Sequence, residues 1–561
     1  MTSGSGQTRG CSKTLDTSAC SDRNYAACRH GAGSFLDGIF EKCPFLHQTG
    51  KDQARPRRDV SDRSACRATD RYGVGAKMVL FQNSLHPLYC YDTAPFKSDG
   101  TCCSEHRSGN MAILAPFRGI TYNFEAGLDL SKLVTPPYDV ISDEEQEFYY
   151  QSDPHNIIRL ILGKRKIGDI DWDNQYTRAA EFFRKWQREG ILVRSENPCI
   201  YLTSLTYRPG FGEPLRTRWG IIAVIRIEDE TSGVILPHEK TFSAHKDDRL
   251  KLMRSCNAQF SPIFGLYEDP GNNILDACLV GADPEPRISF DFRDGTKHRM
   301  WILNNDSLFR ELAAFMSEKR IFIADGHHRY ETSRNFRNIM RERHGRRPAG
   351  RSYEYVMMYL SSMNDKGLTI LPSHRLIKTV PGFDLESFLK TLTTWFNIRE
   401  YPFSDAGIPR DCMNLRTEIR GLGQQDTVIA FCINPVRKFY IFSLKPDARE
   451  KISGDIHPSL KKLDVIVLSR LVLREALGFS KEDLDDTENF HYQSDMETAV
   501  TDVISGTYRM AFLLNPTKIE HVMEIAGNSL VMPRKSTYFY PKVLTGLVIN
   551  EIDPYETIQV P

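Results

Sequence analysis

The chain has 561 residues, of which 40% are hydrophobic, 11% aromatic and 26% charged. Its 73 lysine and arginine residues almost equal its 72 aspartate and glutamate residues, so the formal charge is +1 and no overall field attracts nucleic acid or an anionic membrane. No window approaches the ~18–20 apolar residues of a membrane span, and Met1–His30 lacks an apolar signal core. These features exclude a membrane span and argue against secretion.

Residues 1–110 differ from the rest of the chain. They hold eight of the 13 cysteines and are rich in Gly, Ser, Arg and Asp, without helical or strand periodicity. The cysteine spacings are irregular and include no CxxC pair, so a disordered leader is favoured over a zinc or disulfide cluster. We expect a cytoplasmic protein. Location in an organelle stays open as an alternative because of the long leader, although the acidic residues of the leader argue against a presequence.

From Met111 onward, strand and helix patterns alternate. Ser142 follows a Pro-Pro turn and, with Glu145, predicts a capping box at a helix start. An amphipathic pattern predicts a helix over Tyr176–Glu189. Runs rich in β-branched and aromatic residues predict strands at Cys199–Tyr207, Trp219–Glu228, Ser261–Tyr267, Arg320–Ala324, Tyr355–Ser361, Thr427–Cys432 and Lys438–Leu444. Further helices are predicted at His327–Arg343, Asp384–Phe396 and Ser459–Ala476.

This interleaving predicts a mixed fold, α/β or α+β. At ~100–200 residues per domain, the length fits two or three globular units or one large composite unit. We divide the chain into the leader at 1–110, an N-terminal part at 111–380 and a C-terminal α/β part at 381–561. The last two parts are expected to complete one catalytic unit.

The strongest local signal is an apolar strand that runs into Asp325-Gly326 and at once into a helix. Helix N-termini present unpaired N–H groups and a partial positive charge, which suit phosphate oxygens. Gly326 lets a ligand approach the backbone, and Arg329 can hold a phosphate with two hydrogen bonds. His327 and His328 can donate further hydrogen bonds. The segment therefore predicts an anion site, with a simple N-cap as the alternative role for Asp325.

A second cluster surrounds Glu239. This carboxylate lies between His238 and Lys240, and Arg249 follows soon after. Positive neighbours can keep a carboxylate ionised, so that it can take a proton from a substrate hydroxyl. The alternative is a network of surface salt bridges on a loop. The segment is not the HExxH of a zinc protease, because position 242 is Phe.

Two weaker signals lie further along the chain. His374 and Arg375 end another apolar run, and Lys535 and Thr537 lie in the basic and aromatic segment Met532–Lys542. These side chains could face a ligand, or the segment could be a strand rim with snorkelling lysines. The sequence has no P-loop, no protein-kinase signature set, no GxSxG elbow and no strand-linked GxGxxG. An enzyme that handles phosphate would therefore use an uncommon scaffold here.

Six motifs occur in the same order as in one widespread bacterial and archaeal family, also found in some protists and long uncharacterised. They are Ala115–Gly119, Pro136–Ile141, Asn156–Leu160, His238–Thr241, Ala324–Thr332 and Lys535–Lys542. The resemblance covers about Ala115 to Gly546 and leaves out the leader. Ser333 stands where the family pattern has Ala. The Asp-Gly-His-His-Arg box also resembles the helix-opening box of the ParB/sulfiredoxin-like fold, which includes free-serine kinases.

The resemblance implies a ParB/sulfiredoxin-like core within a larger composite catalytic domain. It also implies a kinase that transfers a phosphoryl group, from pyrophosphate or ADP, to free L-serine and forms O-phospho-L-serine. In that reading Glu239 is the first choice as base, with Asp139 or Asp325 second. One of these carboxylates could instead bind a Mg²⁺ that bridges the phosphates, and the sequence does not assign which carboxylate has which role. The phosphate-binding residues would be Gly326, His327, His328, Arg329, His238, Lys240, Arg249 and Lys535. The substrate-binding residues would be Tyr138, Thr241, His374, Arg375 and Thr537.

Three other readings stay open. A ParB-like DNA- or nucleotide-binding protein is disfavoured by the balanced charge and the lack of a helix-turn-helix pair. A sulfiredoxin-like reductase would need a reactive thiol near the box, and Cys256 reads better as a core residue. A metal-dependent hydrolase would use His327, His328 and His238, but adjacent histidines on a helix point about 100° apart. We therefore expect small-molecule partners, no nucleic acid and no membrane; the oligomeric state is open.

Overall fold

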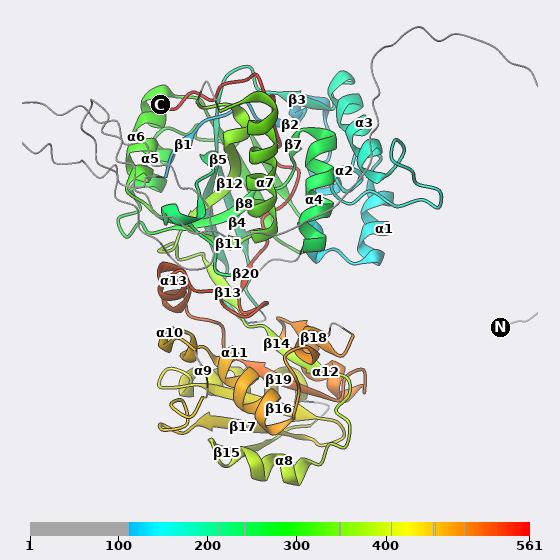
Figure 1. Ribbon diagram of the computed structural model, residues 1–561, viewed down its shortest axis with the longest axis vertical. Coiled ribbons are helices and arrows are strands. Elements are labelled where there is room, and N and C mark those ends of the chain that lie inside the picture. Colours follow the sequence, from blue (N-terminus) through cyan, green and yellow to red (C-terminus); the bar gives the residue numbers. More distant parts are fainter. Residues whose placement is uncertain are drawn as a thin grey trace, which may run out of the picture. The chain divides into compact units, whose positions relative to one another are not determined.

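The chain folds around two large β-sheets, whose strands are rich in β-branched and aromatic residues (Figure 1). The computed structural model describes residues 112–561 apart from 211, 240–242, 347–348, 405–406, 453, 455 and 487. The leader predicted at 1–110, with its eight cysteines, lies outside the described residues. Strands and helices are interleaved, which confirms the predicted mixed α/β class.

The first sheet has nine strands in the order β6-β11-β8-β12-β5-β4-β10-β9, with β1 beside β5. The pairs β6–β11 and β8–β12 are parallel, and the other pairs are antiparallel. The strands are β1 (Leu114–Ala115), β4 (Ile200–Tyr207), β5 (Arg216–Arg226), β6 (Ile235–Leu236), β8 (Ile263–Tyr267), β9 (Ile288–Asp291), β10 (Lys297–Leu303), β11 (Ile321–Asp325) and β12 (Tyr355–Ser362).

Both faces of this sheet are buried. Along β5, Ile221 belongs to one core cluster and Ile222 to the other, because successive side chains of a strand point to opposite faces. The helices that contribute to these two cores include α3 (Gln175–Arg188), α4 (Ser243–Cys256), α5 (Asn273–Val280) and α6 (Asp306–Ser317). Helix α7 (His327–His344) lies beside α4 (Figure 1) and starts directly after β11.

The second sheet has six strands in the order β15-β17-β16-β19-β14-β18, and all neighbouring pairs are antiparallel. The strands are β14 (His374–Ile377), β15 (Phe396–Pro402), β16 (Val428–Ile433), β17 (Lys438–Leu444), β18 (Phe490–Gln493) and β19 (Met510–Leu514). The helices that pack on it include α8 (Leu385–Leu392), α9 (Ile408–Leu422), α12 (Met496–Ile504) and α13 (Ile519–Gly527). Its strand β14 comes before residue 381, where we placed the start of the C-terminal part.

Three short strand pairs join distant parts of the chain. β2 (Ile120–Tyr122) pairs with β3 (Leu192–Arg194). The other two pairs use C-terminal strands: β13 (Thr369–Leu371) with β20 (Tyr538–Tyr540), and β7 (Ala258–Gln259) with β21 (Asn550–Glu551). The C-terminal segment is thereby brought back against residues of the first half, which is how it reaches the site described below.

Local signals placed two helices correctly. The capping box of Ser142 and Glu145 is present at the start of α1 (Asp143–Ser152), and the predicted helix at 176–189 is α3. The continuous helix predicted over Ser459–Ala476 is wrong. Leu463 has extended backbone angles that separate α10 (Pro458–Lys461) from α11 (Asp464–Val467), and a π-helix follows over Leu468–Ala476.

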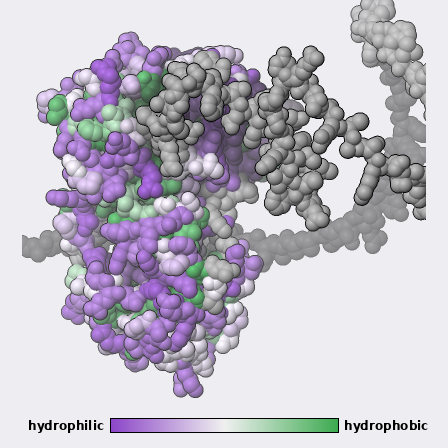
Figure 2. All heavy atoms as spheres, turned by 60° about the vertical axis from the view of Figure 1, so that its left-hand side comes forward, coloured by the Kyte–Doolittle hydropathy of each residue, from purple (hydrophilic) through white to green (hydrophobic). Residues whose placement is uncertain are grey.

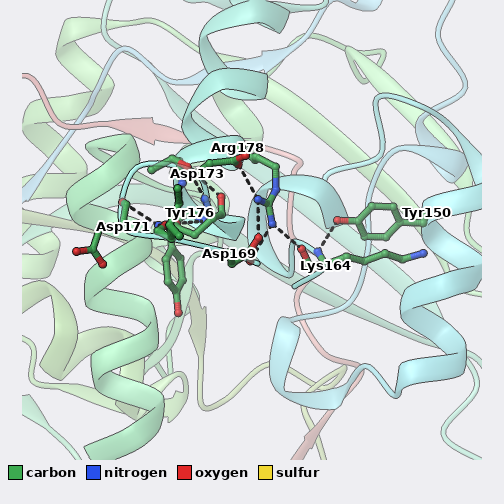
Figure 3. Close-up of polar contacts among 10 residues, drawn as sticks. Tyr150, Lys164, Asp169, Asp171, Asp173, Tyr176 and Arg178 are labelled. Atoms are coloured by element: carbon green, nitrogen blue, oxygen red, sulfur yellow. Dashed lines mark hydrogen bonds and ion pairs between the residues drawn. The ribbon is translucent and has the colours of Figure 1, made fainter. Parts of the chain in front are cut away.

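The loop before α3 is held by one arginine (Figure 3). Arg178 Nη1 donates to Asp169 and to Asp173 at 2.8 Å each, and Nη2 donates to the Lys164 carbonyl at 3.0 Å. At the same end of the loop, the Lys164 amide donates to the Tyr150 hydroxyl at 2.8 Å. This clamp fixes the polar loop that leads into α3 and Tyr176.

Hydrophilic residues predominate on the face of the molecule drawn in Figure 2, and hydrophobic residues show there in small separate groups. Within the described part of the chain, no helix combines the length and the apolar character that a membrane span needs.

Candidate active site

Asp325 lies at the end of β11, where the chain turns sharply into α7. Gly326 makes the turn with φ +93°, a left-handed conformation that glycine adopts without strain. A Cβ on Gly326 would lie 2.9 Å from Cζ of Arg329, so the turn also needs a residue without a side chain. The strand-turn-helix predicted from the sequence is therefore present, and it places Asp325 at the N-terminus of α7.

The Asp325 carboxylate is held between two cations. Lys542 Nζ pairs with one oxygen and Arg329 Nη2 with the other. The three side chains are largely buried, with 10% to 13% of their surface exposed. Burial alone raises the pKa of Asp325, but Lys542 and Arg329 outweigh it and hold that pKa well below its usual range. Asp325 is therefore ionised at neutral pH.

Lys542, one of the two cations, stays protonated although it is buried. Burial lowers its pKa, but the charges of Asp325 and Asp139 reverse the effect, so its pKa is raised. Its ammonium also lies 4.7 Å from the ring centroid of Tyr538. Lys542 ends the basic and aromatic segment that the sequence singled out, but the predicted ligand lysine there was Lys535. Only the folded chain shows which of the two lysines faces inward.

Arg329 connects the pair to a small cavity. Its Nη1 donates to the Pro262 carbonyl, and its side chain lines the cavity together with Tyr138 and Arg249. The Arg249 guanidinium lies 4.0 Å from the ring centroid of Tyr138 and donates to the Ile161 carbonyl at 2.6 Å. Two arginines thus line the same space, which has no carboxylate among its own lining residues.

Asp248 compensates Arg249. Its carboxylate pairs with that guanidinium and accepts a hydrogen bond from the Tyr176 hydroxyl at 2.6 Å. Burial alone raises the pKa of Asp248. Arg249 and the Tyr176 hydroxyl outweigh burial, so the pKa of Asp248 lies below its usual value. A neighbouring cavity of about 280 Å³ is lined by Arg165, Arg249 and Tyr176. Asp248 and Tyr176 were not among the predicted site residues, and no motif marked them.

His238 and His327 meet although 89 positions separate them. The backbone amide of His238 donates to His327 Nε2 at 3.3 Å, and the ring centroids are 4.7 Å apart with perpendicular planes. Burial lowers the pKa of each to about 3, so both are neutral at pH 7. His238 Nε2 lies 3.3 Å from the Thr537 hydroxyl. His328 is half-buried on the first turn of α7.

Glu239 contacts the C-terminal segment. Its Oε1 accepts a hydrogen bond at 2.8 Å from the backbone amide of Lys535, a residue with φ +55°. The Met532 amide also donates to the His238 carbonyl at 2.8 Å. Glu239 therefore helps to hold the strained loop around Lys535, whose side chain is exposed. The predicted ligands Lys240 and Thr241 lie outside the described residues.

Asp139 is exposed on the 3₁₀ turn Tyr138–Val140, within electrostatic reach of Lys542 and Tyr538. The structure thus brings Asp139, the cluster of Asp325 with Arg329 and Lys542, and the pair His238 and His327 into one neighbourhood. Arg375 borders it, because its Nη2 donates to the Lys535 carbonyl at 3.1 Å.

His374 does not join this neighbourhood. It follows the pleat of β14 to the opposite side from Arg375, and its Nδ1 accepts a hydrogen bond from the Leu514 amide at 3.0 Å. His374 and Arg375, both predicted as substrate-binding residues, therefore point to opposite sides of the strand. Among the described residues, no group of three or more His, Cys, Asp or Glu side chains is placed to hold a metal ion.

Several solved structures resemble the chain weakly. A variant of a free serine kinase in complex with AMP is 11% identical, with a TM-score of 0.28, and the match covers 57% of this chain and 87% of that chain. A conserved hypothetical protein from Pyrococcus furiosus is 12% identical, with a TM-score of 0.27 and coverage of 57% and 92%. SbnI from Staphylococcus aureus, truncated at its C-terminus, is 9% identical, with a TM-score of 0.27 and coverage of 58% and 85%. These values are too low to support an argument about activity.

No curated protein sequence matches the chain. Residues 114–466, in contrast, match the family described as "Protein of unknown function (DUF1015)". This range includes the Glu239 segment and the whole turn from β11 into α7, and it accounts for more than half of the chain. The chain therefore belongs to the DUF1015 family.

Proposed function

We propose that the protein is a small-molecule phosphotransferase that phosphorylates the hydroxyl group of free L-serine, with pyrophosphate as the favoured donor. One observation carries the proposal: a buried Asp325 holds Lys542 and Arg329 at the N-terminus of α7. Phosphoryl transfer depends on positioning and on neutralising the charge of the transferred group. Two fixed cations beside a helix N-terminus suit that task.

The size and charge of the adjoining space support the choice of donor. Pyrophosphate has neither base nor ribose, so it needs a compact cationic site and no slot for a purine. Arg329 and Arg249 line one small cavity that has no carboxylate among its lining residues. The neighbouring cavity of about 280 Å³ is balanced in charge, because Asp143 and Asp248 line it beside Arg165 and Arg249. The first cavity therefore supports a small anionic donor. ADP is the alternative donor, and the experiment below separates the two.

The acceptor step needs a carboxylate that is free to take a proton. Both oxygens of Asp325 are ion-paired and its pKa is low, so it is better suited to holding the cations in place. Glu239 uses Oε1 for the Lys535 amide, and its Oε2 makes no hydrogen bond or ion pair to a described residue. Glu239 is therefore our first candidate for the base, and the exposed Asp139 is the second.

The proposed reaction is an in-line displacement. The serine hydroxyl oxygen attacks one phosphorus of pyrophosphate, and the bond from that phosphorus to the bridging oxygen breaks. Orthophosphate leaves, and the hydroxyl proton passes to the carboxylate base. His238 and His327 are neutral, so each can donate one N–H hydrogen bond without adding charge.

Mg²⁺ fits this arrangement. Magnesium binds through one or two carboxylates plus substrate phosphates and does not need a cage of protein ligands. Asp139 has no hydrogen bond or ion pair to the described residues and lies near Lys542, so it is the residue that would hold the ion. When bound there, Mg²⁺ would neutralise part of the phosphate charge.

The test is phosphorus NMR of the full chain with L-serine and Mg²⁺, in separate samples with pyrophosphate, ADP and ATP. We expect an O-phosphoserine resonance with pyrophosphate. Arg329→Gln should raise KM for the donor, and Arg334→Gln is the matched control, because Arg334 is on the same helix and pairs with Glu230 at 2.6 Å. No phosphoserine in any sample would reject the serine kinase, and an equal effect of both variants would remove Arg329 from the donor site.

A further inference from the structure

A second cavity, of about 450 Å³, shares no lining residue with the Asp325 site. It is lined by residues of the first sheet, such as Arg216 of β5, and of the second sheet, such as His374 of β14. His374 of β14 and Arg416 of α9 contribute side chains to it, and Arg216, Glu213 and Asp495 add further charge. Its volume falls within the range of small-molecule sites, about 300–1,000 Å³. Nothing in the proposed phosphoryl transfer uses it.

His374, which lines this cavity, carries a buried ring donor without a partner. The side chain is fully buried, and burial lowers its pKa to about 3, so the ring is neutral at pH 7. Because Nδ1 accepts the Leu514 amide hydrogen, the proton must be on Nε2. Nε2 has no hydrogen-bond partner in the described part of the chain. A buried N–H without an acceptor is costly, which marks this position as one that a ligand can satisfy.

Arg416 is a second uncommitted donor on the wall of the same cavity. It is half-buried on α9, and none of its guanidinium nitrogens makes a hydrogen bond or ion pair to a described residue. Arg420, one turn further along the helix, instead lies 3.5 Å from Glu213. Arg416 is therefore free to bind an anion with two hydrogen bonds.

The carboxylates of the cavity are already engaged. Glu213 lies 3.5 Å from both Arg216 and Arg420. Asp495 caps α12 by accepting hydrogen bonds from the amide and the hydroxyl of Thr498, at 2.8 and 2.9 Å. Three arginines against two carboxylates leave one net positive charge on the lining.

We propose that this cavity is a second binding site, in which His374 Nε2–H and Arg416 hold the oxyanion of a small ligand, a carboxylate or a phosphate group. The buried His374 Nε2–H lacks an acceptor and Arg416 makes no hydrogen bond to a described residue, and both kinds of oxyanion can accept from the two donors. The site does not depend on the proposed kinase activity. It connects with the Asp325 neighbourhood through β14, since Arg375 is the next residue and contacts the Lys535 carbonyl.

The experiment is calorimetric titration of the full chain with inorganic phosphate and, separately, with acetate. We expect at least one of them to bind, and Arg416→Gln to weaken that binding about tenfold, the loss expected for one charge-assisted contact. Arg410→Gln is the matched control, because Arg410 is exposed on the same helix and does not line the cavity. The anion with the larger loss identifies the ligand class.

Phosphate bound at the Asp325 site would still bind in Arg416→Gln. This variant therefore distinguishes binding at the Asp325 site from binding in the second cavity. Binding that is unchanged in Arg416→Gln, or lost equally in Arg410→Gln, would overturn the proposal, as would no heat of binding with either anion. If Arg416→Gln lowers the melting temperature, Arg416→Lys keeps the charge. It should retain only part of the binding, and undiminished binding in a folded Arg416→Lys would overturn the two-hydrogen-bond geometry.

Discussion

Lys542 and Asp325 form a buried ion pair across 217 positions of sequence. Arg329 holds the other carboxylate oxygen, so one negative charge is shared by two cations. A buried ion pair adds little net stability, because both charges lose their hydration, but removing one partner leaves the other uncompensated. This asymmetry makes Lys542 a sensitive position for substitution.

Lys542→Met should lower the free energy of unfolding by about 3 kcal/mol, the cost of leaving part of a buried charge without its partner. Urea denaturation at pH 7 measures this change. Lys535→Met is the control for stability, because that side chain is exposed in the same segment. Equal losses in both variants would show that the segment, and not the ion pair, is responsible.

The buried histidines make stability depend on pH. Burial lowers the pKa from 6.5 to about 3 for His238, His298, His327 and His374. The unfolded chain then binds protons below about pH 6.5 that the folded chain does not bind until about pH 3, so stability falls as the solution is acidified through this window. Each such proton contributes about 1.4 kcal/mol per pH unit.

Urea unfolding measured at several pH values between 3 and 6.5 gives the net slope. Asp464 opposes the histidines by up to one proton, because burial raises its pKa to about 6. His298→Asn should reduce the net slope by about one proton, because His298 is buried among Phe290, Phe292 and Thr296 and away from the candidate site. If the stability of the wild-type chain changes by less than one proton's worth, about 1.4 kcal/mol per pH unit, the four rings are not all buried in neutral form.

Gly326→Ala should damage both stability and activity. The position has φ +93°, and the new Cβ would lie 2.9 Å from Cζ of Arg329. We expect a loss of about 1–3 kcal/mol from backbone strain, and a rise in the donor KM if Arg329 is displaced. Gly295→Ala is the control: its φ is +78°, and no neighbouring atom lies within 4 Å of the position that its Cβ would take. Only the difference between the two variants reports on Arg329.

Arg178→Ala should release the loop shown in Figure 3, because one guanidinium holds Asp169, Asp173 and the Lys164 carbonyl. Hydrogen exchange of residues 164–174 should become faster, while exchange in β5 stays unchanged. Arg188→Ala, near the C-terminal end of the same helix, is the matched control. Unchanged exchange in the loop would show that its backbone contacts suffice without Arg178.

Local patterns predicted much of this architecture. The turn from β11 into α7 follows from an apolar strand, a glycine and a polar helix start, and all of these signals are contiguous. The partner of Asp325 could not be found in this way, because nothing in the local sequence says which of Lys535 and Lys542 turns inward. The opposite directions of His374 and Arg375 follow from strand pleating, but only once the residues are known to lie on a strand.

The base can be identified by comparing two carboxylates. Glu239→Gln keeps an oxygen that can accept the Lys535 amide, so the loop should stay in place while the proton acceptor is lost. If Glu239 is the base, kcat should fall by about 10²–10⁴ with little change in KM, as measured by phosphoserine formation. Asp139→Asn should instead change the dependence on Mg²⁺, because Asp139 is the residue expected to hold that ion. If Glu239→Gln retains kcat while Asp139→Asn loses it at saturating Mg²⁺, the base is Asp139, and Glu239 serves only to hold the Lys535 loop.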